Sequence, residues 1–168
     1  MPRLRTVRYY IAAVFILIAA ISITVLIKGN NPKVKSFSTL EIVNTDSGKV
    51  YDRQLLGDDG EFSIEFIHSV NQSPVYETFK IEGSGIKPSA VRFYSFGAGM
   101  LSDLEEGFVM SRDGDAFIIS GFNRALTELN YIVGTVSDHL LHVNGNSISL
   151  KSLCGKNAHV TLRIGEIK

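Results

Sequence analysis

Two titratable side chains stand within alternating apolar stretches, where they could support acid–base chemistry. In residues 61–68 every second side chain is apolar and the series ends on His68, whereas in residues 75–81 a similar series includes Glu77. Successive side chains of a strand point to opposite faces, so we expect both groups on the apolar side of a hairpin, close to the mouth of loop 69–74. An imidazole beside a carboxylate in a poorly solvated place could exchange protons near neutral pH. The same pair could instead be a structural clasp, which is the commoner arrangement, and the sequence leaves both interpretations open.

Two serines and two glycines near this hairpin are further candidates. Ser69 follows His68 but points to the other face of an extended strand, and the sequence has no Gly-x-Ser-x-Gly elbow that would expose a nucleophile. Ser95 opens a short segment in which Gly97 and Gly99 would allow close approach of the backbone to a ligand or to another strand. The spacing is not that of a phosphate-binding loop, and a corner or bulge is the favoured interpretation.

A second polar cluster follows the strand predicted at residues 128–136. Asp138 and His139 come directly after it, and His139 is predicted to face inwards. With His68 and Glu77 they could form a metal site with two histidines and one carboxylate, if the strands met in space. No His-x-His or His-x-x-x-His spacing prepares such ligands, so we predict neither a metal nor a cofactor. The candidate polar site comprises His68, Ser69, Glu77, Ser95, Gly97, Gly99, Asp138 and His139.

The segments that would position these residues alternate between strand-like runs and turn residues. The expected strands are residues 37–43, 49–56, 61–68, 75–82, 90–96, 107–111, 116–122, 128–136, 140–143, 147–150 and 158–164. This rhythm predicts an all-β sandwich or barrel of roughly 8–11 short antiparallel strands. No sustained helical periodicity occurs after residue 36, and residues 124–127 are the one candidate for a helical turn.

The amino-terminal region has the pattern of a membrane anchor. Tyr9 to Ile27 is a run of 19 uncharged residues, which as a helix would be about 29 Å long and would cross the hydrocarbon core of a bilayer. We therefore expect a cytoplasmic segment at residues 1–8, a single-pass transmembrane helix at 9–27, a linker at 28–36 and an extracytoplasmic domain at 37–168. A cleaved signal peptide is the alternative, but the exit from the apolar run lacks a small-x-small cleavage pattern.

Charge and cysteine content exclude several classes of function. The whole chain has a formal net charge of zero, but residues 29–168 carry 13 lysine and arginine residues against 17 aspartate and glutamate residues, a net charge of −4. Such a domain is poorly suited to binding nucleic acid. The only cysteine, Cys154, excludes an intramolecular disulfide and a cysteine-cluster metal site, and it is expected as a half-buried apolar residue at the end of a strand.

Several segments together resemble a known bacterial family. The series FIHSVNQSPVYETFKIE (66–82), FYSFGAGM (93–100), GFNRALTELNYIVGTVSDHLL (121–141) and ISLKSL (148–153) is similar, in order and spacing, to the small family called domain of unknown function 1850. The resemblance covers most of the chain from about Leu40 onward, and its matched polar positions are the candidate site residues. It implies an extracytoplasmic domain that accompanies tripartite ATP-independent transporters with a TAXI-type solute receptor, and it implies no established activity.

Three functional hypotheses follow. The first is an accessory module, tethered to the bilayer through Tyr9–Ile27, that binds the membrane subunit or the solute receptor of such a transporter. The second is a small-ligand-binding or hydrolytic domain that uses His68, Glu77, Asp138 and His139 around one pocket. The third is a purely structural envelope protein, which would have neither a pocket nor a specific partner.

Overall fold

The computed structural model describes residues 39–96 and 107–165, which lie within one compact unit formed by residues 37–168. The described ranges contain eleven strands and one short helix. The elements are β1 (Thr39–Asn44), β2 (Val50–Leu55), β3 (Glu61–Ile67), β4 (Pro74–Glu82), β5 (Gly85–Phe93), β6 (Val109–Asp113), β7 (Ala116–Ser120), β8 (Glu128–Ile132), β9 (His139–Val143), β10 (Asn146–Ser149), α2 (Leu150–Cys154) and β11 (His159–Gly165). The predicted all-β fold of antiparallel strands is confirmed.

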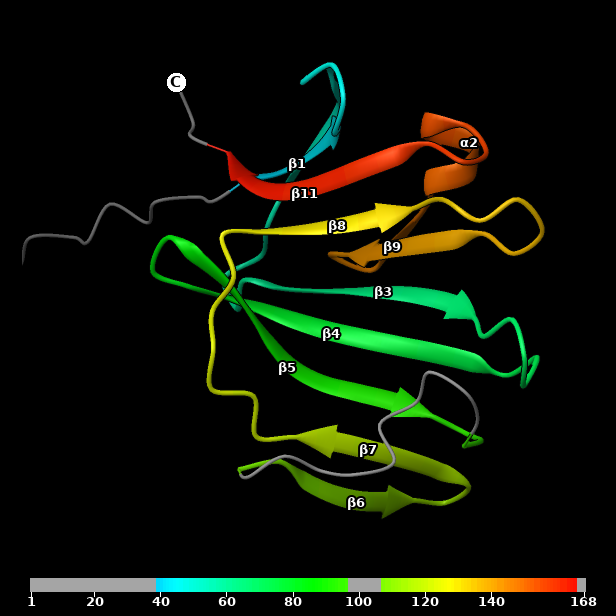
Figure 1. Ribbon diagram of the computed structural model, residues 1–168. Coiled ribbons are helices and arrows are strands. Elements are labelled where there is room, and N and C mark those ends of the chain that lie inside the picture. Colours follow the sequence, from blue (N-terminus) through cyan, green and yellow to red (C-terminus); the bar gives the residue numbers. More distant parts are fainter. Residues whose placement is uncertain (1–38, 97–106, 166–168) are drawn as a thin grey trace, which may run out of the picture. The chain divides into compact units, whose positions relative to one another are not determined.

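The strands form two antiparallel sheets that pack as a sandwich (Figure 1). One sheet has four strands in the order β2-β1-β11-β8, and the other has seven in the order β10-β9-β3-β4-β5-β7-β6. The larger sheet is built mainly from hairpins between consecutive strands, as the short turn segments of the sequence predict.

Alternation of apolar side chains along the strands builds the main core between the sheets. Phe62 and Ile64 of β3 are 3% and 0% exposed, and Phe62 pairs with Phe79 of β4, with stacked rings 5.3 Å apart. From the other sheet, Leu40 of β1 and Leu162 of β11 belong to the same cluster and are fully buried. Burying each such side chain stabilises the fold by about 1.5–3 kcal/mol.

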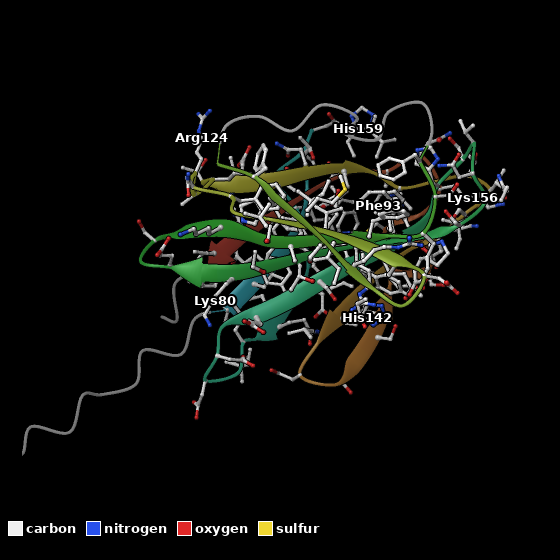
Figure 2. The ribbon with its side chains drawn as sticks, turned by 90° about the horizontal axis from the view of Figure 1, so that it is seen from below. Lys80, Phe93, Arg124, His142, Lys156 and His159 are labelled. Carbon is white, nitrogen blue, oxygen red and sulfur yellow. The ribbon has the colours of Figure 1, made fainter. Side chains whose placement is uncertain are left out.

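A smaller second core lies on β4, β5 and β7. Val75, Phe93 and Ile119 are buried there, and Phe93 stacks on Phe117 at 5.5 Å between ring centroids. Figure 2 shows Phe93 and His142 on opposite sides of the seven-stranded sheet, in keeping with an inner apolar face and an outer polar one. The larger sheet thus extends beyond the main core shared with the four-stranded sheet.

Three local predictions need correction. β5 begins at Gly85 rather than at residue 90, because a register shift opposite Thr78 and Phe79 lets the strand continue through Pro88. Residues 124–127 form no helical turn, since Leu126 makes an extended bridge to Ile86 through two backbone hydrogen bonds. Residues 150–154 are helical instead, so Cys154 ends a helix and not a strand.

The register fixes which loops share an end of the sandwich. Thr39 pairs with Gly165, and these residues lie at the same end as the beginning of β8. Loops 68–73 and 133–138 lie at the other end, where the amide of Ile67 donates a hydrogen bond to Ser137 Oγ at 3.2 Å. The structure therefore brings together two segments, the loop after β3 and the loop after β8, that the sequence analysis identified as separate candidates.

The predicted membrane anchor, Tyr9–Ile27, and the linker lie outside the described residues, as do Gly97 and Gly99. Within residues 39–96 and 107–165, no helix has the length and apolar character needed to cross a membrane.

Candidate functional site

Glu77 is a carboxylate on the inner face of the larger sheet. It lies in β4 directly opposite Ile64 of β3 and Val91 of β5, on the face that also carries Val75 and Phe79. The alternation of the sequence predicted this inward orientation correctly. A carboxylate among apolar neighbours loses hydration, so burial raises the pKa of Glu77 above its ordinary value of 4.5.

The predicted pair between His68 and Glu77 is wrong. Because Ile64 is the partner of Glu77, His68 lies four residues farther along, about 13 Å away at roughly 3.3 Å per residue. His68 Nδ1 instead accepts the backbone N–H groups of Val70 and Asn71, each at 3.3 Å. This imidazole closes the hairpin loop, a local role that alternation along a strand could not predict.

The partner of Glu77 comes from the opposite sheet. The hydroxyl of Tyr131 in β8 donates to Glu77 Oε2 at 2.7 Å, and this hydrogen bond opposes the upward pKa shift that burial causes. Burial and the neighbouring carboxylate together raise the pKa of Tyr131, so its hydroxyl stays protonated and remains the donor. Tyr131 is the residue that the sequence argument missed. Tyr131 alternates with Leu129, which the structure buries, and this alternation could have indicated that Tyr131 also faces inwards.

His139 completes an aromatic group around Tyr131. Its ring stacks on Phe66 at 5.3 Å and lies 5.8 Å from the ring of Tyr131, while Nδ1 accepts the backbone N–H of Gly134 at 3.3 Å. Burial lowers the pKa of His139 below 6.5, and the carboxylate of Asp138 opposes that shift. The imidazole is therefore neutral at pH 7, with its proton on Nε2.

The Glu77–Tyr131 pair borders a groove of about 380 Å³ between the two sheets. β4 and β5 form one wall, β8 forms the other, and residues 122 and 126 of the connecting segment also contribute. Most of the lining is apolar or aromatic, as in Phe79, Val91 and Leu129. Glu77 Oε1 makes no hydrogen bond within the described part of the chain, and the residue is partly exposed where it lines the groove.

Three other described candidates, Asp138, Ser69 and Ser95, do not line this groove. Asp138 accepts hydrogen bonds from Ser149 Oγ and from the backbone N–H of Lys151, so it holds the beginning of α2. Ser69 and Ser95 are exposed at the loop end of the sandwich. Among the candidates that lie in the described part of the chain, the structure therefore brings Glu77 and His139 together, with Tyr131 between them.

A second polar network on the outer face of the larger sheet was also missed. His142 Nε2 lies 2.8 Å from Glu65 Oε2, and Tyr76 donates to Glu65 Oε1 at 3.2 Å. The side chains of His142 and Glu65 are 32% and 22% exposed. These residues belong to three neighbouring strands, and their cross-strand contacts could not be derived before the register was known.

The comparison with protein families identifies a match that covers both walls of the groove. The profile described as "Domain of unknown function (DUF1850)" matches residues 62–150, which run from β3 to the first residue of α2. The chain belongs to the DUF1850 family. The DUF1850 match includes Glu77, Tyr131 and His139, whereas β1, β2 and β11 lie outside it. The comparisons with curated proteins and with solved structures returned no match.

The chemistry available at the groove is that of recognition and proton exchange. Glu77 offers one oxygen to a hydrogen-bond donor or a cation while Tyr131 holds the other. Among the residues described, no cluster of three or more histidine, cysteine, aspartate or glutamate side chains could bind a metal ion. In the same residues, no serine or cysteine side chain hydrogen-bonds to a histidine ring, the contact that would activate a nucleophile.

Proposed function

We propose that this DUF1850 protein is a membrane-anchored, extracytoplasmic binding module whose groove between β4–β5 and β8 takes a small ligand. The observation that carries the proposal is the partly exposed Glu77 carboxylate, which Tyr131 holds and which lines a groove of mostly apolar residues. A concave apolar surface with a few oriented polar groups is the usual form of a small-ligand site. A groove of 380 Å³ is large enough for a compact ring with one polar substituent.

Binding is favoured over hydrolysis because the described residues supply an acid and its hydrogen-bond donor but no activated nucleophile. His139, the nearest imidazole, stacks on aromatic rings and uses Nδ1 to accept a backbone N–H. These contacts suit a residue that orients Tyr131 better than one that transfers protons to a substrate.

The groove can be tested with three probes of similar size: the isosteric pair benzyl alcohol and benzylamine, and the anion benzoate. The full chain in detergent micelles, labelled with ¹⁵N, should show concentration-dependent shifts of backbone amides in β4, β5 and β8 for at least one probe. Val91→Trp fills the groove beside Glu77 and should abolish these shifts, whereas Ile118→Trp, on the outer face of the same sheet, should leave them. Absence of groove shifts with all three probes would refute the site.

The module is proposed to work beside a tripartite ATP-independent transporter that uses a TAXI-type receptor. Support comes from the resemblance of its motifs to proteins that accompany such transporters and from the anchor pattern at Tyr9–Ile27. Affinity purification of the tagged full chain from host membranes in mild detergent should recover the transporter's membrane subunit or its solute receptor. A tagged single-pass protein unrelated in sequence serves as the control. Recovery of no transporter component would refute this part of the proposal.

A further inference from the structure

The charged side chains that line the groove are all of one sign. Glu77 and Glu128 line it, and its other lining residues include no lysine, arginine or histidine. By sequence, residues 29–168 carry a net charge of −4, so the segment has no excess of positive charge to offset these carboxylates. An anionic ligand would meet repulsion and find no counter-charge.

The lysines of β4 and β5 form ion pairs with carboxylates that do not line the groove. Lys80 pairs with Glu61 at 3.4 Å and Lys87 pairs with Glu82 at 3.1 Å. Figure 2 shows Lys80 and Arg124 reaching outwards from the body of the domain. Glu77 therefore has no basic partner in the described structure, and its contact across the sheets is the neutral hydroxyl of Tyr131.

The aromatic lining favours the same class of ligand. Phe122 and Tyr131 both border the groove, and Phe122 is fixed by packing on Phe108 with ring centroids 4.9 Å apart. The faces of aromatic rings carry negative electrostatic potential and attract cations at short range. An apolar body would contact side chains such as Val91 and Leu129 while an ammonium group reached Glu77 Oε1.

We infer that the groove selects small organic cations, molecules with an apolar or aromatic body and a protonated amine that pairs with Glu77. This inference rests on the proposed function, because it specifies the chemistry of the ligand in the same groove. The ammonium supplies the charge that the Glu77 site lacks, and a charge-assisted hydrogen bond in a poorly hydrated place is stronger than a neutral one. The neutral isostere loses this contact but keeps the apolar ones.

The same three probes separate the inference from the proposed function. In the wild-type full chain at pH 7.5, benzylamine should shift the groove amides at about tenfold lower concentration than benzyl alcohol, and benzoate should bind worst. Glu77→Gln keeps an oxygen for the Tyr131 hydroxyl but removes the charge, so the amine and the alcohol should become equivalent. Glu128→Gln removes the same charge from an exposed residue and is the matched control, which should keep most of the preference.

Acidity provides a second readout. Lowering the pH protonates Glu77, so the preference for the amine should weaken as the pH falls towards 4.5. The titratable groups that face or border this position are Tyr131 and Glu128 from β8 and His139 from β9, while Ile64 and Val91 from the flanking strands carry no charge. Repeating the titration in Glu128→Gln separates the contribution of that carboxylate.

The possible results of these titrations separate the cation preference from the existence of the ligand site. Equal binding of alcohol and amine in the wild type, or preference for benzoate, overturns the cation inference and leaves the groove as a ligand site. Loss of the preference in Glu128→Gln, with retention in Glu77→Gln, overturns the assignment to Glu77. Failure of all three probes to shift the groove amides overturns the inference and the proposed function together. The wild-type comparison decides the charge preference even if Glu77→Gln does not fold.

Discussion

Tyr131→Phe removes one hydroxyl from the contact between the two sheets and keeps the ring. In the native protein this hydroxyl donates to Glu77 Oε2 at 2.7 Å. A hydrogen bond to a charged group contributes about 1.5–3 kcal/mol, and the accessible groove lets water replace part of it, so we expect a loss of about 1.5–2 kcal/mol at pH 7. For a domain of this size, that loss lowers the melting temperature by about 6–8 °C.

The variant should also change the titration of Glu77. The Tyr131 hydrogen bond favours the ionised carboxylate, so its removal raises the pKa of Glu77 further above 4.5. A carboxyl group with a raised pKa in the folded state destabilises the protein at high pH. This cost disappears as the pH falls through the folded-state pKa towards the unfolded-state value. The stability difference between wild type and Tyr131→Phe should therefore shrink with acidification.

Two measurements on the detergent-solubilised full chain check this reasoning. Thermal unfolding followed by tyrosine fluorescence gives the stability difference, since the chain has no tryptophan. Carboxyl ¹³C resonances as a function of pH give the pKa of Glu77. Tyr76→Phe is the matched control, because its hydroxyl binds Glu65 on the outer face at 3.2 Å and its loss should not move the Glu77 titration. An unchanged melting temperature together with an unchanged Glu77 titration in Tyr131→Phe would refute the proposed coupling.

Three further predictions concern the scaffold. Glu41→Gln should lower the free energy of unfolding by about 1–2 kcal/mol at pH 7, because two arginines bind this carboxylate and lower its pKa. Urea unfolding should show that this difference from the wild type vanishes as the pH falls through the lowered pKa of Glu41. A difference that does not change with pH would contradict the prediction. Gly134→Ala should displace its loop, since the new Cβ would lie 2.2 Å from the Ser137 carbonyl oxygen, and unchanged amide shifts across residues 133–138 would count against this. Burial raises the pKa of the Cys154 thiol to about 11, so thiol-reactive reagents should label it slowly at pH 8. Asp138→Ala should weaken the cap of α2 by about 1 kcal/mol and thereby speed the labelling of Cys154. An unchanged labelling rate in this variant would argue against the cap.

The sequence predicted the strands well because alternation and turn residues are local signals. Eleven strand-like runs correspond to the eleven strands, and the inward position of Glu77 follows from its place in the alternation. The five-residue helix was missed because so short a segment shows no helical periodicity. The contact of Glu77 was also missed, since no local pattern states which residue of the opposite sheet lies above a given strand position. The prediction for His68 failed for a different reason. The alternation of β3 was extended to this residue, although His68 lies beyond the strand and closes the hairpin loop.

The order of strands in the smaller sheet also sets the sequence in which the protein can fold. β11 lies between β1 and β8, and Thr39 pairs with Gly165, so this sheet joins the two ends of the domain. Such distant pairing slows folding, because closing so long a loop costs conformational entropy before the contact can offset it. β8 can be held in its sheet only after β11 has been synthesised and docked. The hydrogen bond from Tyr131 of β8 to Glu77 of β4 is therefore expected to form late, after the hairpins of the larger sheet and after β11 has docked.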